Sequence, residues 1–368
     1  MTSSTLGKAW QWVMNSLTNH NTLADYLEPL INGVVPGWRA DRLRSYVTHV
    51  RNENADMYSL VIKPNKKWKG FEAGQYIELT VEKNGAWMSR YFSISSSPEY
   101  FQITGLIELS IRIQEQGRIT PWLPNALKAN GIVNISQAMG EFTLNPEHQN
   151  ICMIAGGSGI TPFRSMLQQL NLQSAQSNQN ITLMYYARSD QHFLFEDEFK
   201  QVSNLNPLIQ LNLMNSEYDG NINQSHLDVF VKPESDTHFY ICGPSPMIVL
   251  TRKLLQEANI NSDHIHYEFF GPEPLSLDIQ SEGAAILFER SNKQIESDAD
   301  ETSTLLEIAE QNNLNPVSGC RMGVCHQCIC QKKSGVVYNT KTQTYSDTGA
   351  QEIQLCISVP VNDVVLDL

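Results

Sequence analysis

Five of the seven cysteines crowd the C-terminal end of the chain, and the spacing of four of them constrains the fold more than any other feature. Cys320, Cys325 and Cys328 follow a C-x4-C-x2-C pattern, and Cys356 comes 28 positions later. This is the plant-type spacing for a [2Fe–2S] cluster, in which three thiolates come from one loop and the fourth from a distant segment. Zinc sites favour pairs of C-x2-C, and only one such pair occurs here. We therefore expect these four cysteines to hold a [2Fe–2S] cluster.

Cys330 is the cysteine nearest to this set that does not fit the pattern. It follows Cys328 by two positions in a segment, residues 324–331, that is predicted to be a strand. We expect its side chain to point away from the cluster and to pack rather than ligate. Gly319 and Gly323 are expected to let backbone N–H groups approach the cluster sulfurs.

The composition excludes several classes of protein. The chain has 368 residues, enough for two or three domains, and 41% of them are hydrophobic. The net charge of −13 is a poor match for nucleic acid, whose phosphates require clustered Lys and Arg. No apolar run approaches the roughly 18 residues of a membrane-spanning helix, and no apolar signal core precedes Trp10. We expect a cytoplasmic protein, a setting in which structural disulfides are rare.

The patterning divides the chain into four segments. Residues 1–37 carry apolar side chains at helical spacing, and residues 38–146 contain the alternating runs that are typical of strands. Residues 147–272 alternate apolar strands with helical stretches, which is the pattern of a parallel α/β sheet. A segment with proline and glycine then leads to the cysteine-containing residues 280–368. We expect a helical N-terminal extension followed by three domains.

Residues 147–272 contain a nucleotide-binding signature. An apolar strand, residues 151–155, leads into a glycine-rich turn and a helix, which together offer backbone N–H groups and a positive dipole end to a phosphate. Alone, such a turn could be only a tight connection, but a second strand also runs into a turn and helix. Parallel strands would bring both turns to the carboxyl edge of the sheet, where ligands bind. The expected binding residues are Gly156, Gly157, Gly159, Thr161 and Pro162 in the first turn and Cys242, Gly243, Pro244 and Met247 in the second. The G-x-G-x-x-G pattern is missing, so an ordinary Rossmann dehydrogenase is disfavoured.

The preceding segment carries a resemblance to a known family. From Ser89 to Ser96 it reads Ser-Arg-Tyr-Phe-Ser-Ile-Ser-Ser, similar to the flavin motif Arg-x-Tyr-Ser-x-x-Ser of the ferredoxin–NADP reductase superfamily. Phenylalanine replaces the family tyrosine, so stacking on the flavin survives but a hydroxyl contact to the ribityl chain is lost. The turn at Gly117 is similar to a second family element, Gly-x-x-Ser, with threonine in place of serine. The resemblance covers residues 40–368, and by it the flavin-binding residues are Arg90, Phe92, Ser93, Ser96, Gly117, Ile119 and Thr120.

The resemblance implies a fold and a set of roles. The fold is an antiparallel β-barrel that binds FAD, a parallel-sheet α/β domain that binds NAD(P)H, and a β-grasp [2Fe–2S] ferredoxin domain. Ser93 is implied near flavin N5 and Cys242 near the nicotinamide, while Arg90 neutralises phosphate. Glu268 and Phe270 match positions where the family places an acid and an aromatic ring against the isoalloxazine. Packing of an interdomain strand explains these two residues equally well.

Two choices of cofactor follow. FAD is expected rather than FMN, because the members of the family that this chain resembles most use FAD. The adenosine ribose should lie at the end of the strand 181–187, where Arg188 and Ser189 can hold a 2′-phosphate. An acid there, such as the following Asp190, would instead bind the 2′-hydroxyl of NADH. NADPH is therefore expected rather than NADH.

The resemblance implies an electron-transfer reductase that passes electrons from NAD(P)H through the flavin and the cluster to a separate protein. A self-contained reductase would not need the cluster, and a redox sensor would not need the flavin and nucleotide motifs. Residues 281–368 carry 12 acids and 6 bases. This acidic surface is either a solvated face or a means of steering the domain toward a basic acceptor.

The N-terminal extension suggests which acceptor is served. Together with residues 66–76, it makes the chain most similar to bacterial reductases that feed membrane di-iron fatty acyl-CoA desaturases. An NADH-dependent reductase for a Rieske oxygenase or for a hybrid-cluster protein is the alternative. The extension either caps the reductase or docks at the inner face of the membrane, and for docking Trp10 and Trp12 are the expected side chains.

Overall fold

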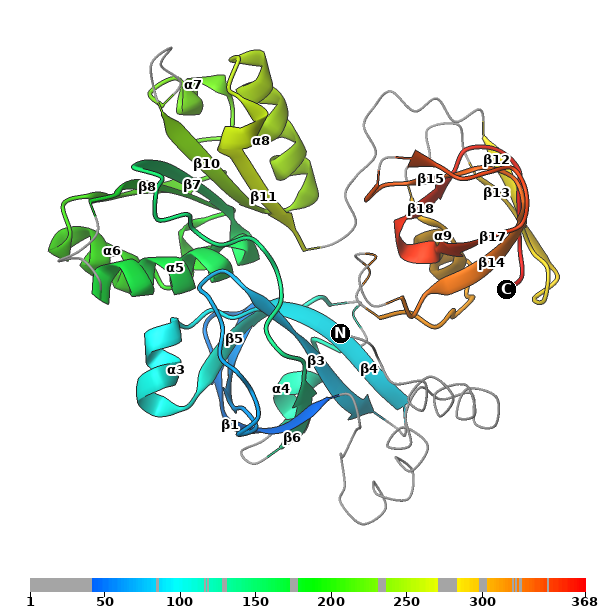
Figure 1. Ribbon diagram of the computed structural model, residues 1–368, viewed down its shortest axis with the longest axis horizontal. Helices are drawn as coiled ribbons and strands as arrows, with labels where there is room; N and C mark the ends of the chain where they lie inside the picture. The colour runs from blue at the N-terminus through cyan, green and yellow to red at the C-terminus, as the bar shows by residue number, and fades with distance from the viewer. Residues whose placement is uncertain are drawn as a thin grey trace, which may run out of the picture. The chain divides into compact units, whose positions relative to one another are not determined.

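The computed structural model describes residues 42–368 apart from several gaps. The gaps are 84–85, 116, 118, 128–130, 173–177, 231–235, 271–282, 298–302, 320, 322, 324–325 and 343. The expected N-terminal helices lie outside the described residues. Internal contacts divide the chain into two compact units, which are Met1–Leu144 with Thr161–Gln176, and Asn145–Ile160 with Ser177–Leu368. Figure 1 shows the elements of each unit, coloured along the chain.

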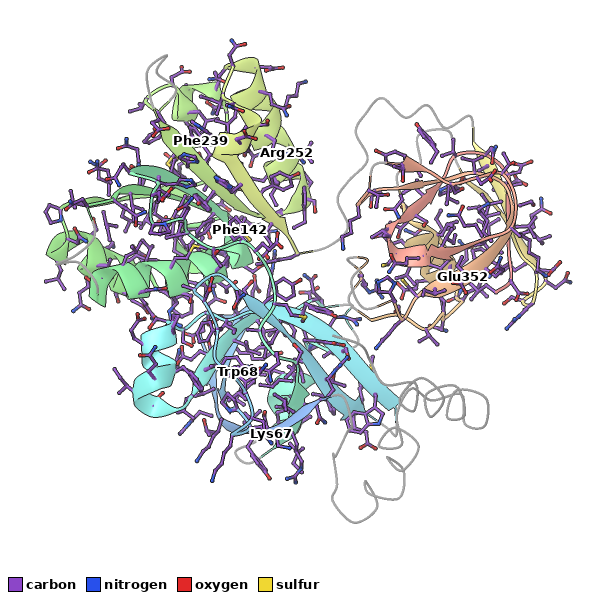
Figure 2. All side chains as sticks on the ribbon, in the orientation of Figure 1. Lys67, Trp68, Phe142, Phe239, Arg252 and Glu352 are labelled. Carbon is purple, nitrogen blue, oxygen red and sulfur yellow. The ribbon has the colours of Figure 1, made fainter. Side chains whose placement is uncertain are left out.

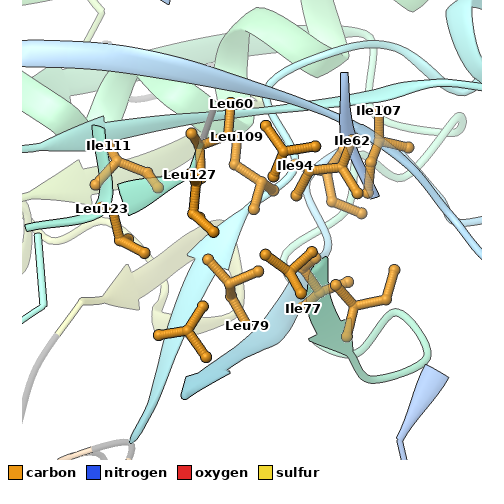
Figure 3. Packing of buried hydrophobic residues seen from close by; sticks show 14 of the residues in the cluster. Leu60, Ile62, Ile77, Leu79, Ile94, Ile107, Leu109, Ile111, Leu123 and Leu127 are labelled. Atoms are coloured by element: carbon orange, nitrogen blue, oxygen red, sulfur yellow. The ribbon is translucent and has the colours of Figure 1, made fainter. Parts of the chain in front are cut away.

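The first unit contains a six-stranded antiparallel sheet in the order β4-β3-β6-β1-β2-β5. Its strands are β1 (Leu43–Asn52), β2 (Met57–Lys63), β3 (Tyr76–Lys83), β4 (Ala86–Ser93), β5 (Ile107–Arg112) and β6 (Ile132–Ile135). Alternation along β3 sends Ile77 and Leu79 into one hydrophobic core, where they meet Leu60 and Leu109 (Figure 3). Full burial of each such side chain contributes about 1.5–3 kcal/mol, which makes this core the main stabilising feature of the barrel.

A short helix follows the flavin motif. The helix α3 (Pro98–Thr104) begins at Ser97, whose side chain accepts the backbone N–H of Tyr100, and proline occupies its first turn. It ends at Gly105, which adopts the left-handed conformation with φ of 69°. A second short helix, α4 (Leu123–Ala126), lies between β5 and β6 in the sequence.

The second unit begins with a parallel five-stranded sheet in the order β11-β10-β7-β8-β9. Its strands are β7 (Asn150–Gly156), β8 (Asn180–Ala187), β9 (Ile209–Asn215), β10 (Thr237–Gly243) and β11 (Ile265–Phe269). Its connections contain α6 (Glu196–Leu205), α7 (Gln224–Leu227) and α8 (Ser245–Glu257), with short 3-10 turns at η1 (Gly157–Gly159), η2 (Asp190–His192) and η3 (Ser262–His264). The helix α5 (Ile160–Leu172) follows η1 along the chain and belongs, from Thr161 on, to the first unit. Phe239 (Figure 2) and Ile241 on β10 are fully buried with Ile248 and Leu255 of α8.

The described part of the C-terminal segment contains two sheets and the helix α9 (Leu305–Gln311). The five-stranded sheet contains β13 (Lys293–Ser297), β12 (Ala284–Phe288), β19 (Val364–Leu366), β14 (Ile329–Ser334) and β17 (Gln351–Gln354), in that order. A three-stranded sheet contains β16 (Thr344–Tyr345), β15 (Val337–Asn339) and β18 (Ser358–Pro360), and η4 (Leu355–Ile357) precedes β18. The helix α9 (Leu305–Gln311) starts with a capping box between Thr304 and Glu307. The side chain of Lys332 is fully buried, and its ammonium donates to the carbonyl oxygens of Gly335, Asp347 and Gly349.

The expected fold class of three domains is confirmed by these sheets and by the comparisons reported below. Among the described residues, the helices are too short or too polar to cross a membrane.

Candidate functional site

The flavin motif lies on β4. Arg90 is paired with Leu79 and Phe92 with Ile77 across the β3–β4 ladder, so both half-buried side chains lie on one face of the sheet. Ser93 ends the strand and is 5% exposed. Its Oγ is buried and has no hydrogen-bond partner among the described residues. Because an unpaired buried hydroxyl is costly, this position fits a ligand that supplies the missing hydrogen bond.

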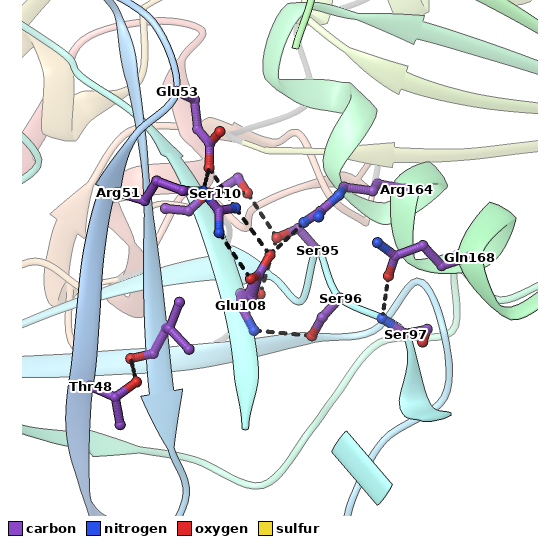
Figure 4. A network of polar contacts seen from close by, with 12 residues as sticks. Thr48, Arg51, Glu53, Ser95, Ser96, Ser97, Glu108, Ser110, Arg164 and Gln168 are labelled. Carbon is purple, nitrogen blue, oxygen red and sulfur yellow. Dashed lines mark hydrogen bonds and ion pairs between the residues drawn. The ribbon is translucent and has the colours of Figure 1, made fainter. Parts of the chain in front are cut away.

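The loop after the motif is tied to the helix α5 (Figure 4). The carbonyl of Ser96 accepts the Ser165 hydroxyl at 2.6 Å, and the side-chain oxygen of Gln168 accepts the Ser97 N–H at 2.8 Å. The Ser96 hydroxyl accepts the backbone N–H of Glu108 at 3.0 Å, which leaves its own hydrogen to donate. The same helix that follows the glycine-rich turn therefore fixes the loop that follows the flavin motif.

A buried ion pair strengthens this attachment. Arg164 of α5 donates to Oε2 of Glu108 on β5 at 2.7 Å, and Arg51 on β1 approaches Oε1 at 3.4 Å. Burial alone would raise the pKa of Glu108, but the two guanidinium groups outweigh it and hold this pKa below its ordinary value. Glu108 is therefore a carboxylate at neutral pH.

The second flavin element is a closed turn. The Gly117 N–H donates to the carbonyl of Gln114 at 2.7 Å, and the Thr120 hydroxyl accepts the Gln114 N–H at 2.9 Å. A Cβ on Gly117 would lie 2.8 Å from the Gln114 oxygen, so a larger residue cannot fit without a shift. Ile119, in contrast, is buried in the barrel core.

The first nucleotide turn joins β7 to α5. The chain turns through η1, where Gly157 has φ of 52°, in the left-handed region that favours glycine. A Cβ on Gly157 would meet nothing within 4 Å, so open space lies beside the turn at the start of a helix. Thr161 and Pro162 are buried in the first turn of α5. This combination fits a phosphate group bound by backbone N–H groups.

The two predicted turns meet through their backbones. A Cβ on Gly159 would lie 2.1 Å from the carbonyl oxygen of Cys242, and one on Gly243 would lie 3.0 Å from the nitrogen of Gly156. A Cβ on Gly156 would also strike Met247 and Pro244, at 2.5 and 2.8 Å. The structure therefore brings together the expected residues of both turns at the carboxyl ends of β7 and β10.

Cys242 and Glu268 are direct neighbours on the parallel strands β10 and β11. Cys242 is fully buried, and Oε2 of Glu268 is buried without a hydrogen-bond partner among the described residues. Burial raises the pKa of Glu268 to about 8, and burial with the nearby carboxyl raises the pKa of Cys242. At pH 7 a neutral thiol and a neutral carboxyl therefore lie side by side. Phe270 lies just beyond β11 and is 41% exposed.

The residues expected to select the coenzyme follow β8. Arg188 is exposed at the carboxyl end of this strand, and the Ser189 hydroxyl lies 2.8 Å from Nδ1 of His192. The carboxylate of Asp190 accepts the side-chain amide of Asn215 at 2.7 Å. Asp190 is therefore hydrogen-bonded to β9, whereas the exposed Arg188 lies at the carboxyl end of β8.

The cluster cysteines are described in part, since Cys320 and Cys325 fall in gaps. Cys328 and Cys356 are each 2% exposed. The carbonyl of Cys328 accepts the N–H of Leu355 at 3.0 Å, so the sheet holds the third and fourth cysteines on adjoining segments. Cys330 is buried in the same domain core. The strand expected over residues 324–331 begins only at Ile329, because Cys328 lies in the turn before it.

The described residues of the cysteine loop have a left-handed backbone conformation. Arg321, Gly323 and His326 all have positive φ, at 62°, 66° and 57°. A Cβ on Gly323 would lie 2.5 Å from Cδ1 of Ile357, the residue after Cys356, so the loop packs directly against the fourth cysteine's segment. The buried Cys328 and Cys356, together with the packing of Gly323 against Ile357, fit a cluster that is held by four thiolates.

The sequence did not point to Arg164 or Glu108. The available signal was a single basic residue in α5, whose other side chains are apolar, hydroxyl or amide. Its partner lies 56 positions earlier and could not be identified from spacing.

Comparisons with known proteins agree with this geometry. Residues 45–144 match the oxidoreductase FAD-binding domain, residues 153–253 the oxidoreductase NAD-binding domain, and residues 288–361 the 2Fe-2S iron-sulfur cluster binding domain. The chain is therefore an NAD(P)H-dependent flavin and iron–sulfur oxidoreductase. More particularly, it has the three-domain architecture of ferredoxin–NADP reductase-like proteins, with a C-terminal [2Fe–2S] domain.

Individual relatives cover most of the chain. An NADPH oxidoreductase of Mycobacterium tuberculosis is 27% identical over 90% of this chain and 86% of its own length. NADH oxidoreductase HCR of Escherichia coli is 26% identical, covering 88% and 97%. A glycine betaine monooxygenase reductase subunit of Chromohalobacter salexigens is 22% identical, covering 81% and 87%. The structure of phthalate dioxygenase reductase shares the fold, with a TM-score of 0.62 at 23% identity over 89% of this chain and 98% of that one.

Proposed function

We propose that this reductase takes electrons from NADPH and delivers them to a membrane di-iron fatty acyl-CoA desaturase. The observation that carries the electron-transfer role is the presence of three cofactor cradles in one chain, described above. The acidic composition of residues 281–368 supports delivery from the cluster domain to a basic protein surface. The predicted boundaries 1–37, 38–146, 147–272 and 280–368 are part of the proposal, and the three family matches fall within the last three.

In the flavin cradle, we assign each residue one task. The Ser93 hydroxyl, which lacks a partner in the described structure, donates to the isoalloxazine edge at N5, and the Phe92 ring packs against its plane. Arg90 binds phosphate oxygens, and Thr120 holds the turn of the second flavin element, where its hydroxyl accepts the Gln114 N–H. FAD supplies the conversion between a two-electron donor and a one-electron acceptor.

In the nucleotide cradle, the glycines of the first turn bring backbone N–H groups to the coenzyme phosphates. Cys242 and Glu268 flank the nicotinamide, and the neutral carboxyl can donate a hydrogen bond without adding charge. Arg188 binds the 2′-phosphate of NADPH, an assignment supported by the engagement of Asp190 with Asn215. One relative is named for NADPH and another for NADH, so the names do not decide between the coenzymes. The assignment of NADPH therefore depends on the residues at the carboxyl end of β8.

Two other acceptors compete with the desaturase, namely a Rieske oxygenase and a hybrid-cluster protein. The similarity to reductase components of a glycine betaine monooxygenase and of phthalate dioxygenase favours an oxygenase, and the E. coli relative, an NADH oxidoreductase, favours the NADH-dependent alternative. The N-terminal extension, whose predicted helices differ from the short preface of most Rieske reductases, favours the desaturase. Peripheral attachment to the membrane through this extension belongs to the same proposal.

Reconstitution distinguishes these acceptors. The purified holoprotein is combined with NADPH, oxygen, stearoyl-CoA and membranes that contain the desaturase. We expect a monounsaturated product whose formation requires this protein and slows as ionic strength rises, because salt screens the docking charges. If the protein supports turnover of a Rieske oxygenase but gives no desaturated product, the oxygenase replaces the desaturase as the proposed acceptor.

A further inference from the structure

Four histidines gather at the amino-terminal edge of the parallel sheet, far from the turns described above. His148 lies two residues before β7, His238 is the second residue of β10, and His266 is the second residue of β11. His264 lies in η3, immediately before β11. Because β10 pairs with both β7 and β11, these residues come together although they span more than a hundred positions. The phosphate-binding turns lie at the other end of β7, about 20 Å along a seven-residue strand.

The spacing of three of these side chains fits a metal ion. Potential ligand atoms of His148, His238 and His266 all lie within 4.8 Å of one another. Nδ1 of His238 is 3.2 Å from Nε2 of His266. Two nitrogens bound to a tetrahedral ion at about 2.0–2.1 Å are separated by about 3.3 Å. The observed pair is therefore already at the separation that a shared ion requires.

The surroundings of the cluster keep the imidazoles neutral. Burial and the neighbouring histidines lower the pKa of His238 to about 4, and the same two causes lower the pKa of His266. Burial also lowers the pKa of His148, although the carboxylate of Asp236 acts in the opposite direction. A neutral imidazole offers a lone pair, which is the form that binds metal. Oδ1 of Asp236 lies 3.9 Å from Nε2 of His238 and supplies a negative charge at the rim.

A further contact orients one imidazole. The Tyr240 hydroxyl lies 3.0 Å from Nδ1 of His148 and holds this ring in its present orientation. The His148 and His238 rings are stacked, with centroids 3.3 Å apart and planes within 8°. Ligation of both therefore requires the His148 ring, which lies on a loop, to turn edge-on toward the ion.

We propose that His148, His238 and His266 bind one zinc ion, with water as the fourth ligand. Imidazole ligands select zinc and similar transition metals over magnesium and calcium, which prefer oxygen. An ion here joins the loop before β7 to two strands and stabilises the nucleotide domain without touching either phosphate-binding turn. A second set, Asp236, His238 and His264, shares His238 and is the competing ligand set.

Zinc binding to the chelator-washed holoprotein tests the site. We expect one zinc per chain by calorimetry, three nitrogen neighbours at about 2.0 Å in the zinc K-edge spectrum, and a Tm that rises with zinc concentration. His266→Gln is expected to weaken binding at least about tenfold. His264→Gln and the exposed His49→Gln, a matched histidine on β1, are expected to retain it.

Two results would overturn the assignment. The first is that the wild-type protein binds no zinc, or that His238→Gln and His266→Gln each bind it as tightly as the wild-type protein does. The other is loss of binding in His264→Gln with retention in His266→Gln, which would select the competing set. Flavin absorbance monitors folding of each variant, and His148→Gln, on the loop, provides the same test if a strand variant fails to fold. Since the readout is zinc binding, its outcome is independent of the acceptor proposed above.

Discussion

The guanidinium of Arg164 lies 2.7 Å from the carboxylate of Glu108, and both side chains are about 92% buried (each 8% exposed). Each charge has lost most of its hydration, so the pair is stable only while both partners are present. Arg51 also approaches Glu108, but its own side chain is 46% exposed. The two arginines thus form a natural comparison between a buried and a solvated contact to one carboxylate.

We expect Arg164→Met to lower the free energy of unfolding by about 3 kcal/mol, because it leaves a buried carboxylate poorly compensated. Arg51→Met is the matched control and should cost no more than about 1 kcal/mol. Urea unfolding, followed by the release of flavin fluorescence, measures both values. The double variant Glu108→Gln, Arg164→Met should be more stable than Arg164→Met alone. Equal losses for the two arginine variants would contradict this account.

Two cysteines separated by one residue should respond differently to the same substitution. Cys328→Ser is expected to abolish the [2Fe–2S] signal, because it removes one of four thiolate ligands. Cys330→Ser should retain it, because this side chain packs in the domain core. Iron content and the electron paramagnetic resonance of the reduced protein provide the measurement. Loss of the cluster in Cys330→Ser at unchanged protein stability would require a different ligand set.

A second pair of buried cysteines tests the nucleotide cradle. Cys242→Ala should slow flavin reduction by NADPH by up to about 10²-fold, the scale of a misplaced reacting atom. Cys152→Ala, on β7 of the same sheet, removes an equally buried thiol that contacts Met184 and should leave this rate within about twofold of wild type. Stopped-flow absorbance records the step directly. Similar rates for both variants would remove Cys242 from the proposed site.

The neutral carboxyl of Glu268 makes stability depend on pH. Between pH 4.5 and about 8 the unfolded chain ionises this group while the folded chain retains its proton. The folded state therefore binds more protons, and its stability falls as pH rises through this window. Glu268→Gln lacks the effect, so its Tm relative to wild type should rise by about 3 °C or more from pH 5 to pH 8. The exposed Glu257→Gln on α8 is the control, and a difference that is flat with pH would refute the buried neutral form.

The coenzyme preference can be tested at one side chain. Arg188→Ala should reduce kcat/KM for NADPH by about tenfold or more while changing that for NADH little, because only NADPH carries the 2′-phosphate. Lys200→Ala, an exposed cation on α6, should leave the ratio unchanged. If the ratio of the two coenzymes stays the same in Arg188→Ala, the arginine has no role in selection.

The elements with strong local patterns could be predicted from the sequence. The apolar run at residues 151–155 and the alternating runs within residues 38–146 predicted strands correctly, and the spacing of the cysteines predicted the correct domain class. The start of β14 was wrong by several residues, because the strand period was extended into a turn where His326 has positive φ. Boundaries of this kind depend on turn conformation, which residue pattern alone does not specify.

Interactions between distant segments could not be predicted. The pairing of Arg164 with Glu108, and the meeting of His148 with His238 and His266, depend on strand order and register. Neither is contained in the local pattern of any one segment. The direct pairing of Cys242 with Glu268 has the same origin, although each residue was expected individually near the nicotinamide and flavin.

The close approach of Gly159 to Cys242 has a genetic consequence. A methyl group on Gly159 meets a main-chain carbonyl oxygen, an atom that every amino acid carries. No replacement of the side chain at position 242 can therefore create the missing space. A selection for suppressors of Gly159→Ala should therefore return true revertants rather than second changes at position 242.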